Sequence, residues 1–243
     1  MRIIRVHTEQ ALEAGRETQL EPGPSRHLVR VLRQRAGHEL ALFNGDGFEY
    51  FGTITATGPG DRCSVAVKQR REVQVESPLF ITLVQAVARG DRMDFSIQKA
   101  CELGVGAIQP VFTERTEVRL EGQRADKRLR HWQQVAVAAC EQSGRVRVPA
   151  VEAPVALTGL AWPPGGLVHL DPLADRALGR MQPPGADGVV LVIGPEGGLS
   201  EQEIDWLRRQ GSTGLRLGPR ILRTETAGPA AIAALQTAFG DWQ

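Results

Sequence analysis

The chain has few of the residues that build disulfide frameworks or metal sites. Its three cysteines, Cys63, Cys101 and Cys140, lie far apart. None belongs to a Cys-x-x-Cys pair or has a histidine nearby at metal-ligand spacing. We therefore expect three buried free thiols and no metal centre.

Long hydrophobic runs are also absent. No apolar stretch approaches the roughly 20 residues that a membrane helix needs, and the first residues lack the apolar core of a secretory signal peptide. With 42% hydrophobic and 23% charged residues, the composition is that of an ordinary globular protein, which excludes long disorder. We expect a cytoplasmic protein without membrane partners, and 243 residues suffice for two domains.

Lysine is scarce, because it occurs only at positions 68, 99 and 127. Arginine carries almost all the positive charge and clusters at 26–35, at 70–71 and at 124–130. A net charge of +1 gives no indication of nucleic-acid binding, but arginine suits two-pronged contacts with phosphate. A solvated arginine-rich surface is the alternative explanation of these clusters.

The chain changes character near residue 75. Up to about residue 70 it has short strand patterns, among them 39–43 and 48–55 around the turn Asn44-Gly-Asp-Gly47, which together predict a hairpin. One helical stretch covers about 25–35. A polar stretch before Pro78 indicates a boundary, so we predict domains at 1–72 and 73–243.

After Pro78, strand and helix patterns alternate. The expected strands are 80–87, 107–112, 166–170 and 188–193, and the expected helices are 93–103, 126–143 and an alanine-rich one reaching about residue 239. Such alternation predicts an α/β domain whose mostly parallel sheet is covered on both faces.

A glycine-rich turn follows one of the apolar strands. The segment 189–193 runs into Gly194-Pro-Glu-Gly-Gly198, and Ser200 with Glu203 forms a capping box for the next helix. Such a turn at the carboxyl end of a parallel strand is typical of a ligand loop. The missing Lys-Ser/Thr and Gly-x-Gly-x-x-Gly patterns exclude a Walker loop and a dinucleotide loop, and a purely structural turn is the alternative.

A second polar segment lies before the alanine-rich helix. Arg223 and Glu225 follow an apolar stretch, where unpaired polar groups are costly unless they bind something. We expect Thr226 to cap the helix and Pro229 to lie in its first turn, where the missing N–H costs little.

Together these two segments become recognisable. Gly194-Pro-Glu-Gly-Gly-Leu-Ser200 and Leu217-Gly-Pro-Arg-Ile-Leu-Arg-Thr-Glu-Thr-Ala227 closely resemble the signature of the RsmE family within the SPOUT methyltransferases, which methylate N3 of a uridine in 16S ribosomal RNA. The resemblance extends to 98–105, 139–145 and 27–33, and so covers nearly the whole chain.

The resemblance implies a small PUA-like β-barrel in front of a SPOUT α/β domain with a trefoil knot. In that family S-adenosylmethionine lies in the knot, and a homodimer completes each site. Carried onto this chain, the cofactor-binding residues are Leu170, Gly194, Glu196, Gly197, Gly198, Leu217, Gly218, Ile221 and Leu222.

The acceptor chemistry assigns roles to Arg223 and Glu225. N3 of uridine is a weakly acidic imide that becomes nucleophilic as its proton leaves. Arg223 would stabilise charge on a uridine oxygen, and Glu225 would orient Arg223 or accept the proton. The orienting role is favoured, because a carboxylate beside an arginine is a weak base.

We expect a set of polar residues to contact the small ribosomal subunit: His27, Arg30, Arg33, Arg89, Lys99, Gln142 and Arg145. At position 89 the family more often has a lysine, and either cation can bind phosphate. Two rival functions remain, namely ribose 2′-O methylation by the same fold and a non-catalytic RNA-binding assembly protein. The motif set argues against the first, and retention of both ligand loops argues against the second.

Overall fold

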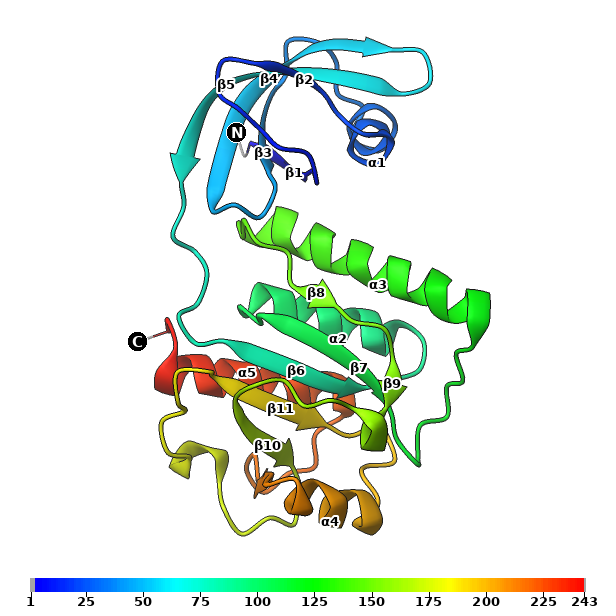
Figure 1. Cartoon of the computed structure of the whole chain (residues 1–243), viewed down its shortest axis with the longest axis vertical. Coiled ribbons are helices and arrows are strands. Elements are labelled where there is room, and N and C mark those ends of the chain that lie inside the picture. Colours follow the sequence, from blue (N-terminus) through cyan, green and yellow to red (C-terminus); the bar gives the residue numbers. More distant parts are fainter. Residues whose placement is uncertain (1–2, 243) are drawn as a thin grey trace. The chain divides into compact units, whose positions relative to one another are not determined.

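The computed structural model describes residues 3–242, and the chain divides into two compact units (Figure 1). The first unit contains Met1–Glu76 and Cys140–Val148, and the second contains Ser77–Ala139 and Pro149–Gln243. A short segment of the second half of the chain therefore belongs with the first unit.

The first unit is built on a five-stranded sheet of order β1-β3-β4-β5-β2. Its strands are β1 (Ile4–His7), β2 (Glu17–Gln19), β3 (Glu39–Phe43), β4 (Phe48–Gly58) and β5 (Arg62–Glu72), with β1 parallel to β3 and the other pairs antiparallel. The predicted hairpin is confirmed as β3–β4, and Gly45 and Gly47 in its turn have φ of 92° and 95°.

A short helical stretch lies between β2 and β3 in the chain. Helix α1 (Pro22–Arg26) continues into the π-helical turn η1 (His27–Val31), so the helical stretch begins and ends earlier than predicted. Two residues later Arg33 has a φ of 53°, a left-handed conformation that stops the helix.

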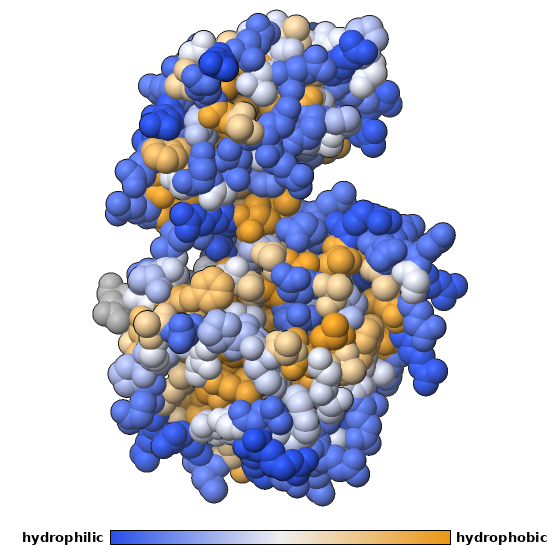
Figure 2. Space-filling view, viewed as in Figure 1, coloured by the Kyte–Doolittle hydropathy of each residue, from blue (hydrophilic) through white to orange (hydrophobic). Residues whose placement is uncertain are grey.

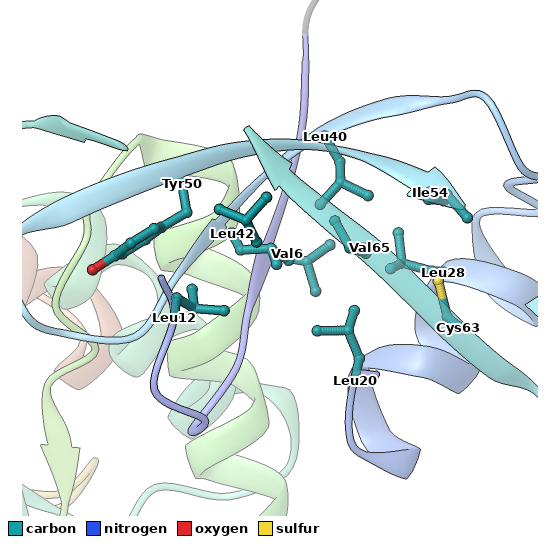
Figure 3. Close-up of a cluster of buried hydrophobic side chains, with 11 residues drawn as sticks. Val6, Leu12, Leu20, Leu28, Leu40, Leu42, Tyr50, Ile54, Cys63 and Val65 are labelled. Atoms are coloured by element: carbon teal, nitrogen blue, oxygen red, sulfur yellow. The ribbon is translucent and has the colours of Figure 1, made fainter. Parts of the chain in front are cut away.

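Alternating side chains of the strands form the core of this unit. Figure 3 shows Val6, Leu28 and Val65 gathered between the strands and α1, and all three are at most 1% exposed. Cys63 lies in the same cluster, and burial raises the pKa of its thiol. The prediction of buried free cysteines is confirmed for Cys63, Cys101 and Cys140.

Arg5 joins the segment Cys140–Val148 to the sheet of the first unit. Its guanidinium bonds the Glu49 carboxylate at 2.7 Å and donates to the backbone oxygens of Cys140 at 2.7 Å and Arg145 at 2.9 Å. The last carbonyls of a helix have no partner within the helix, so this arginine supplies the missing donors. Glu76 accepts from the Arg145 guanidinium at 2.6 Å and completes the network.

The second unit is an α/β domain around a parallel sheet of order β12-β10-β11-β6-β7-β8, with β9 paired to β7. Its strands are β6 (Ile81–Ala86), β7 (Ala107–Phe112), β8 (Ala150–Val151), β9 (Val155–Ala156), β10 (Gly166–Leu170), β11 (Val189–Ile193) and β12 (Thr213–Leu215). Its helices are α2 (Asp91–Glu102), α3 (Gly122–Ser143), α4 (Glu201–Arg209) and α5 (Thr224–Phe239), with 3₁₀ turns η2 (Leu157–Gly159) and η3 (Leu178–Arg180).

Helices cover both faces of this sheet, as predicted. Val84 and Val192 point to one face and pack in a cluster with Leu207 of α4. On the other face Leu83 lies against Gly228 of α5, where an added Cβ would be 3.8 Å from the leucine Cδ1. Burial on both faces explains why β6 and β11 are continuous buried runs rather than alternating ones.

The start of α5 differs from the prediction. The helix begins at Thr224 with Arg223 at the N-cap, so the expected cap at Thr226 is wrong and Pro229 lies inside the helix. Thr224 is 4% exposed and its hydroxyl is bonded to other parts of the unit, whereas Thr226 is exposed within the first turn. Buried hydrogen bonds at Thr224 therefore decide where the helix starts.

None of the helices in residues 3–242 is both long and apolar enough to cross a bilayer.

Candidate active site

The loops with the predicted site residues emerge at one edge of the parallel sheet. Gln85 of β6 is opposite Ile193 of β11, and Leu170 of β10 is opposite Leu215 of β12. Because parallel strands end at the same edge, the segments that follow β6, β10, β11 and β12 lie next to one another. The structure thus brings together regions that are far apart in sequence, such as Gln85 and Thr224, which are 139 residues apart and share a hydrogen bond.

All the predicted cofactor residues belong to these segments. Leu170 is the last residue of β10, and the turn after β11 contains Gly194, Glu196, Gly197 and Gly198. The segment after β12 contains Leu217, Gly218, Ile221 and Leu222. The φ angles of Gly198 and Gly218 are 72° and 73°, so these two turns need glycine.

Thr224 anchors the first residue of the glycine-rich turn. Its hydroxyl donates to the Gly194 carbonyl at 2.7 Å and accepts from the Gln85 side-chain amide at 2.9 Å. Gln85 is fully buried, and its amide also donates to the backbone oxygen of Ala86. This polar chain connects β6, the turn after β11 and the start of α5. A glutamine inside an otherwise apolar strand was the one sequence signal of it.

Arg115 holds the middle of the same turn. Its guanidinium donates to the Gly197 carbonyl at 2.9 Å and approaches the Leu199 carbonyl at 3.4 Å. A Cβ added at Gly197 would lie 3.3 Å from the Arg115 Cβ, so the open side of this glycine faces an arginine side chain. At Gly194 an added Cβ would lie 3.1 Å from the Leu199 nitrogen. Neither position leaves room for a side chain without displacement.

Glu196 fastens the turn to the start of α2. Its Oε1 accepts from the Arg89 backbone N–H at 3.1 Å and from the Arg92 guanidinium at 2.9 Å. Burial acts to raise the pKa of Glu196, but backbone N–H groups and the charge of Arg92 outweigh it, and the pKa lies below its ordinary value. Glu196 therefore stays ionised near neutral pH. Sequence analysis did not identify Arg92 or Arg115, because neither lies in the two loops.

Arg223 and Glu225 lie side by side at the start of α5. The Arg223 NH1 is 4.0 Å from Glu225 Oε1, and the Arg223 side chain is 78% exposed. The Glu225 side chain is only 16% exposed, and its Oε2 is buried without a hydrogen-bond partner in the described chain. Arg223 is thus free to meet a ligand from solvent, while Glu225 carries an unused acceptor.

Two large apolar side chains near this edge are unusually exposed. The visible surface is mostly hydrophilic, with smaller apolar areas (Figure 2). Against that background Leu173, in the segment after β10, is 89% exposed, and Ile221, in the segment after β12, is 84% exposed. Exposed apolar groups beside loops rich in backbone N–H and C=O groups fit a ligand that has an apolar ring and polar edges.

Three predicted RNA contacts lie in the helical turn of the first unit and just after it. The Arg30 guanidinium bonds Asp61 at 2.7 Å while its side chain stays 70% exposed. The His27 side chain is 39% exposed and lies 4.0 Å from Glu141, whose pKa is raised mainly by burial. Arg33 is held in its left-handed conformation next to this turn. The histidine and the two arginines lie within one stretch of seven residues.

The other predicted RNA contacts differ in whether their side chains already pair with other residues of the chain. In the first unit Gln142 is exposed, whereas Arg145 is buried and paired with Glu76. In the second unit Arg89 pairs with Glu117 at 2.6 Å, and Lys99 pairs with Glu102 at 2.8 Å. Their contact with RNA stays a prediction, and for Arg145 it requires the pair with Glu76 to open.

No cluster of three or more histidine, cysteine or acidic residues suited to a metal ion occurs within residues 3–242.

The comparisons with known proteins assign the family. A model described as the RNA methyltransferase domain matches residues 75–236, and one described as the RNA methyltransferase PUA domain matches 25–67. Ribosomal RNA small subunit methyltransferase E of Buchnera aphidicola is 32% identical to this chain, and the match covers 99% of this chain and 98% of the relative.

Solved structures agree with the family models. The enzyme of that name from Neisseria gonorrhoeae, bound to S-adenosylmethionine, is 40% identical, has a TM-score of 0.92 and covers 100% of both chains. A Legionella pneumophila methyltransferase in complex with the same cofactor is 36% identical, with a TM-score of 0.92 and coverage of 99% and 100%. The loop geometry, the domain models and these relatives converge, and the chain belongs to the ribosomal RNA small subunit methyltransferase E family.

Proposed function

We propose that this chain transfers a methyl group from S-adenosylmethionine to N3 of a specific uridine in 16S ribosomal RNA of the small ribosomal subunit. The observation that carries the proposal is the meeting of the Gly194–Gly198 turn, the segment after β12 and the Arg223–Glu225 pair at one sheet edge. The family assignment and the cofactor-bound relative from Neisseria gonorrhoeae support it.

The cofactor loops have the features that S-adenosylmethionine needs. Gly194, Gly197 and Gly198 form a tight turn whose backbone N–H and C=O groups would bond the polar parts of the cofactor, and the exposed Ile221 offers apolar area for an adenine ring. Leu170, Glu196, Leu217, Gly218 and Leu222 complete the proposed set. When bound, the cofactor supplies an electrophilic methyl group on a sulfonium. The residues of the chain hold and orient it.

The acceptor base would be activated by the start of α5. The exposed Arg223 guanidinium is a donor for a uridine oxygen on which negative charge develops as N3 loses its proton. Glu225 orients Arg223 or accepts that proton, and the 4.0 Å distance between its Oε1 and the Arg223 guanidinium supports the orienting role. Both groups act without a metal ion in this scheme.

RNA binding would use residues of both units. We propose that residues 1–72 form an RNA-binding domain and 73–243 the methyltransferase domain, with His27, Arg30, Arg33, Arg89, Lys99, Gln142 and Arg145 contacting RNA. The exposed side chains of Arg30 and Arg33 support RNA binding by the first of these domains, since phosphate contacts need accessible positive charge.

Three further properties belong to the proposal. The C-terminal segment is threaded into a trefoil knot. A homodimer completes each site, and the protein works in the cytoplasm, where its substrate is assembled. Each follows from the family resemblance.

A methyl-transfer assay tests the proposal. Small subunits from a strain lacking the gene are incubated with the protein and labelled S-adenosylmethionine, and the nucleosides of 16S RNA are identified by mass spectrometry. We expect one N3-methyluridine per subunit. Label on a ribose would favour the 2′-O alternative, and cofactor binding by calorimetry without any transfer would favour an assembly protein.

A further inference from the structure

The start of α2 places an arginine between the cofactor turn and Glu225. Arg92 is the second residue of α2, which follows β6 after the turn at Gly90. Strand β6 lies beside β11, with Gln85 opposite Ile193, so the chain that enters α2 emerges next to the turn that begins at Gly194. Arg92 is therefore adjacent to both loops that the proposed function uses.

The Arg92 guanidinium faces two carboxylates from different segments. Its NH1 donates to Glu196 Oε1 at 2.9 Å, and its Nε lies 3.8 Å from Glu225 Oε1. The Arg223 side chain, 78% exposed, lies 4.0 Å from the same oxygen of Glu225, whereas the Arg92 side chain is 43% exposed. Because solvent screens charge pairs, the better-shielded Arg92 contributes more than Arg223 to the placement of Glu225.

The contacts of Glu225 are one-sided. Its Oε1 faces both arginines, while Oε2 is buried and receives no hydrogen bond from the described residues. A buried carboxylate oxygen without a donor lowers stability, and such groups in native proteins call for a functional explanation. Arg92 and Arg223 both approach the carboxylate through Oε1, so these two arginines fix its position from one side.

We propose that Arg92 is a positioning residue for methyl transfer, which holds Glu225 beside the cofactor turn by bonding Glu196 and facing Oε1 of Glu225. The inference rests on the proposed function. It adds Arg92, which lies outside both loops, as the residue that links them. Glu196, which anchors the cofactor turn, and Glu225, which is proposed to act on the acceptor, both face the Arg92 guanidinium.

The link to the cofactor turn is tested by binding alone. Calorimetry with S-adenosylmethionine compares Arg92→Met, Glu196→Gln and the double variant. We expect each single change to weaken binding by about five- to tenfold, since Arg92→Met removes the donor to Glu196 and Glu196→Gln removes the negative charge that strengthens the same bond. The double variant should bind S-adenosylmethionine no more weakly than the weaker-binding of the two single variants does. Arg130→Met, at an exposed arginine of α3, is the matched control and should bind as the parent does. Parent-like binding by Arg92→Met, or effects that multiply, would overturn the link.

The link to Glu225 is tested by the rate. Single-turnover transfer to undermethylated small subunits at saturating cofactor should fall by about tenfold or more in Arg92→Met. Arg92→Lys should recover part of the loss, because it keeps the charge but not the planar fork. Combined with Glu225→Gln, Arg92→Met should slow transfer no further than Glu225→Gln alone. A full rate in Arg92→Met, or multiplying effects, would overturn the positioning role.

Two controls keep the outcomes apart. If Arg92→Met does not fold, as judged by circular dichroism, Arg92→Lys replaces it in both cycles with smaller expected effects of the same pattern. If the parent protein itself transfers no methyl group to any subunit, the proposed function fails. The binding cycle then decides the link between Arg92 and Glu196 by itself.

Discussion

Replacing Thr224 by valine tests whether the start of α5 is tied to the cofactor turn. Valine has nearly the shape of threonine, so the packing is kept while the hydroxyl is lost. The change removes the 2.7 Å bond to the Gly194 carbonyl and the 2.9 Å bond from the Gln85 amide. Both partners are then left short of a hydrogen bond in a site where Thr224 is 4% exposed.

The expected cost follows from those two bonds. A lost hydrogen bond together with an unsatisfied buried partner costs about 1 to 3 kcal/mol, so two that share one hydroxyl should cost about 2 to 4 kcal/mol. For a domain of this size the melting temperature should fall by roughly 5 to 15 °C. Binding of S-adenosylmethionine should weaken as well, because the turn loses the anchor of its first residue.

Tryptophan fluorescence is a selective assay for this change. Trp132, Trp162, Trp206 and Trp242 all belong to the second unit, so thermal melts followed by fluorescence report on the domain that contains Thr224. Thr226→Val is the matched control, since it makes the same substitution two residues later at an exposed position and should change stability by less than about 0.5 kcal/mol. Equal melting temperatures for the two variants would refute the reasoning.

Four further predictions concern the cofactor turn, the catalytic arginine, the RNA and pH. Gly197→Val should weaken cofactor binding by about tenfold or more in calorimetry, because overpacking against Arg115 costs about 1 to 3 kcal/mol, and unchanged affinity would contradict the loop assignment. Arg223→Ala should lower turnover by about 100-fold or more with little change in cofactor affinity, and near-normal turnover in a stable variant would remove Arg223 from the mechanism. Removing residues 1–72 should greatly weaken RNA binding in filter assays but spare cofactor affinity, whereas equal loss of both would make the front module part of the catalytic fold. Burial lowers the pKa of His169, so the unfolded chain binds a proton at this residue more readily than the folded chain does. The contribution of neutral His169 to the free energy of unfolding is therefore fully present above the ordinary pKa of 6.5 and is lost as pH falls below it. The melting temperature followed by fluorescence should drop between about pH 7.5 and 5.5, and it should drop less in His169→Gln.

Local features of the sequence predicted much of the fold. The strands that became β7 and β10 were predicted with their observed ends, and the capping box of Ser200 and Glu203 is present in the structure. These features depend on neighbouring residues, so the sequence alone is enough. The strands β8, β9 and β12 were not predicted, because two or three residues are too few to show a period.

Long-range contacts account for what the sequence did not predict. Thr224 and Thr226 are the same residue type two positions apart, but only Thr224 bonds Gln85, which lies 139 residues before it, and Gly194, which lies 30 residues before it. Arg92 reaches Glu196 across 104 residues, and the Arg5 bond to Cys140 spans 135. Such pairings depend on the folded topology. Neither the secondary-structure propensity of the residues nor the spacing of motifs predicts them.

The most direct measurement is the modification state of 16S ribosomal RNA in cells. Mass spectrometry of RNA fragments would compare a strain lacking this gene with the same strain carrying it back on a plasmid. The account predicts that one N3-methyluridine disappears in the deletion strain and returns with the parent gene but not with the Arg223→Ala gene. An unchanged set of 16S methyl groups in the deletion strain, or loss of a ribose methyl group in its place, would contradict it.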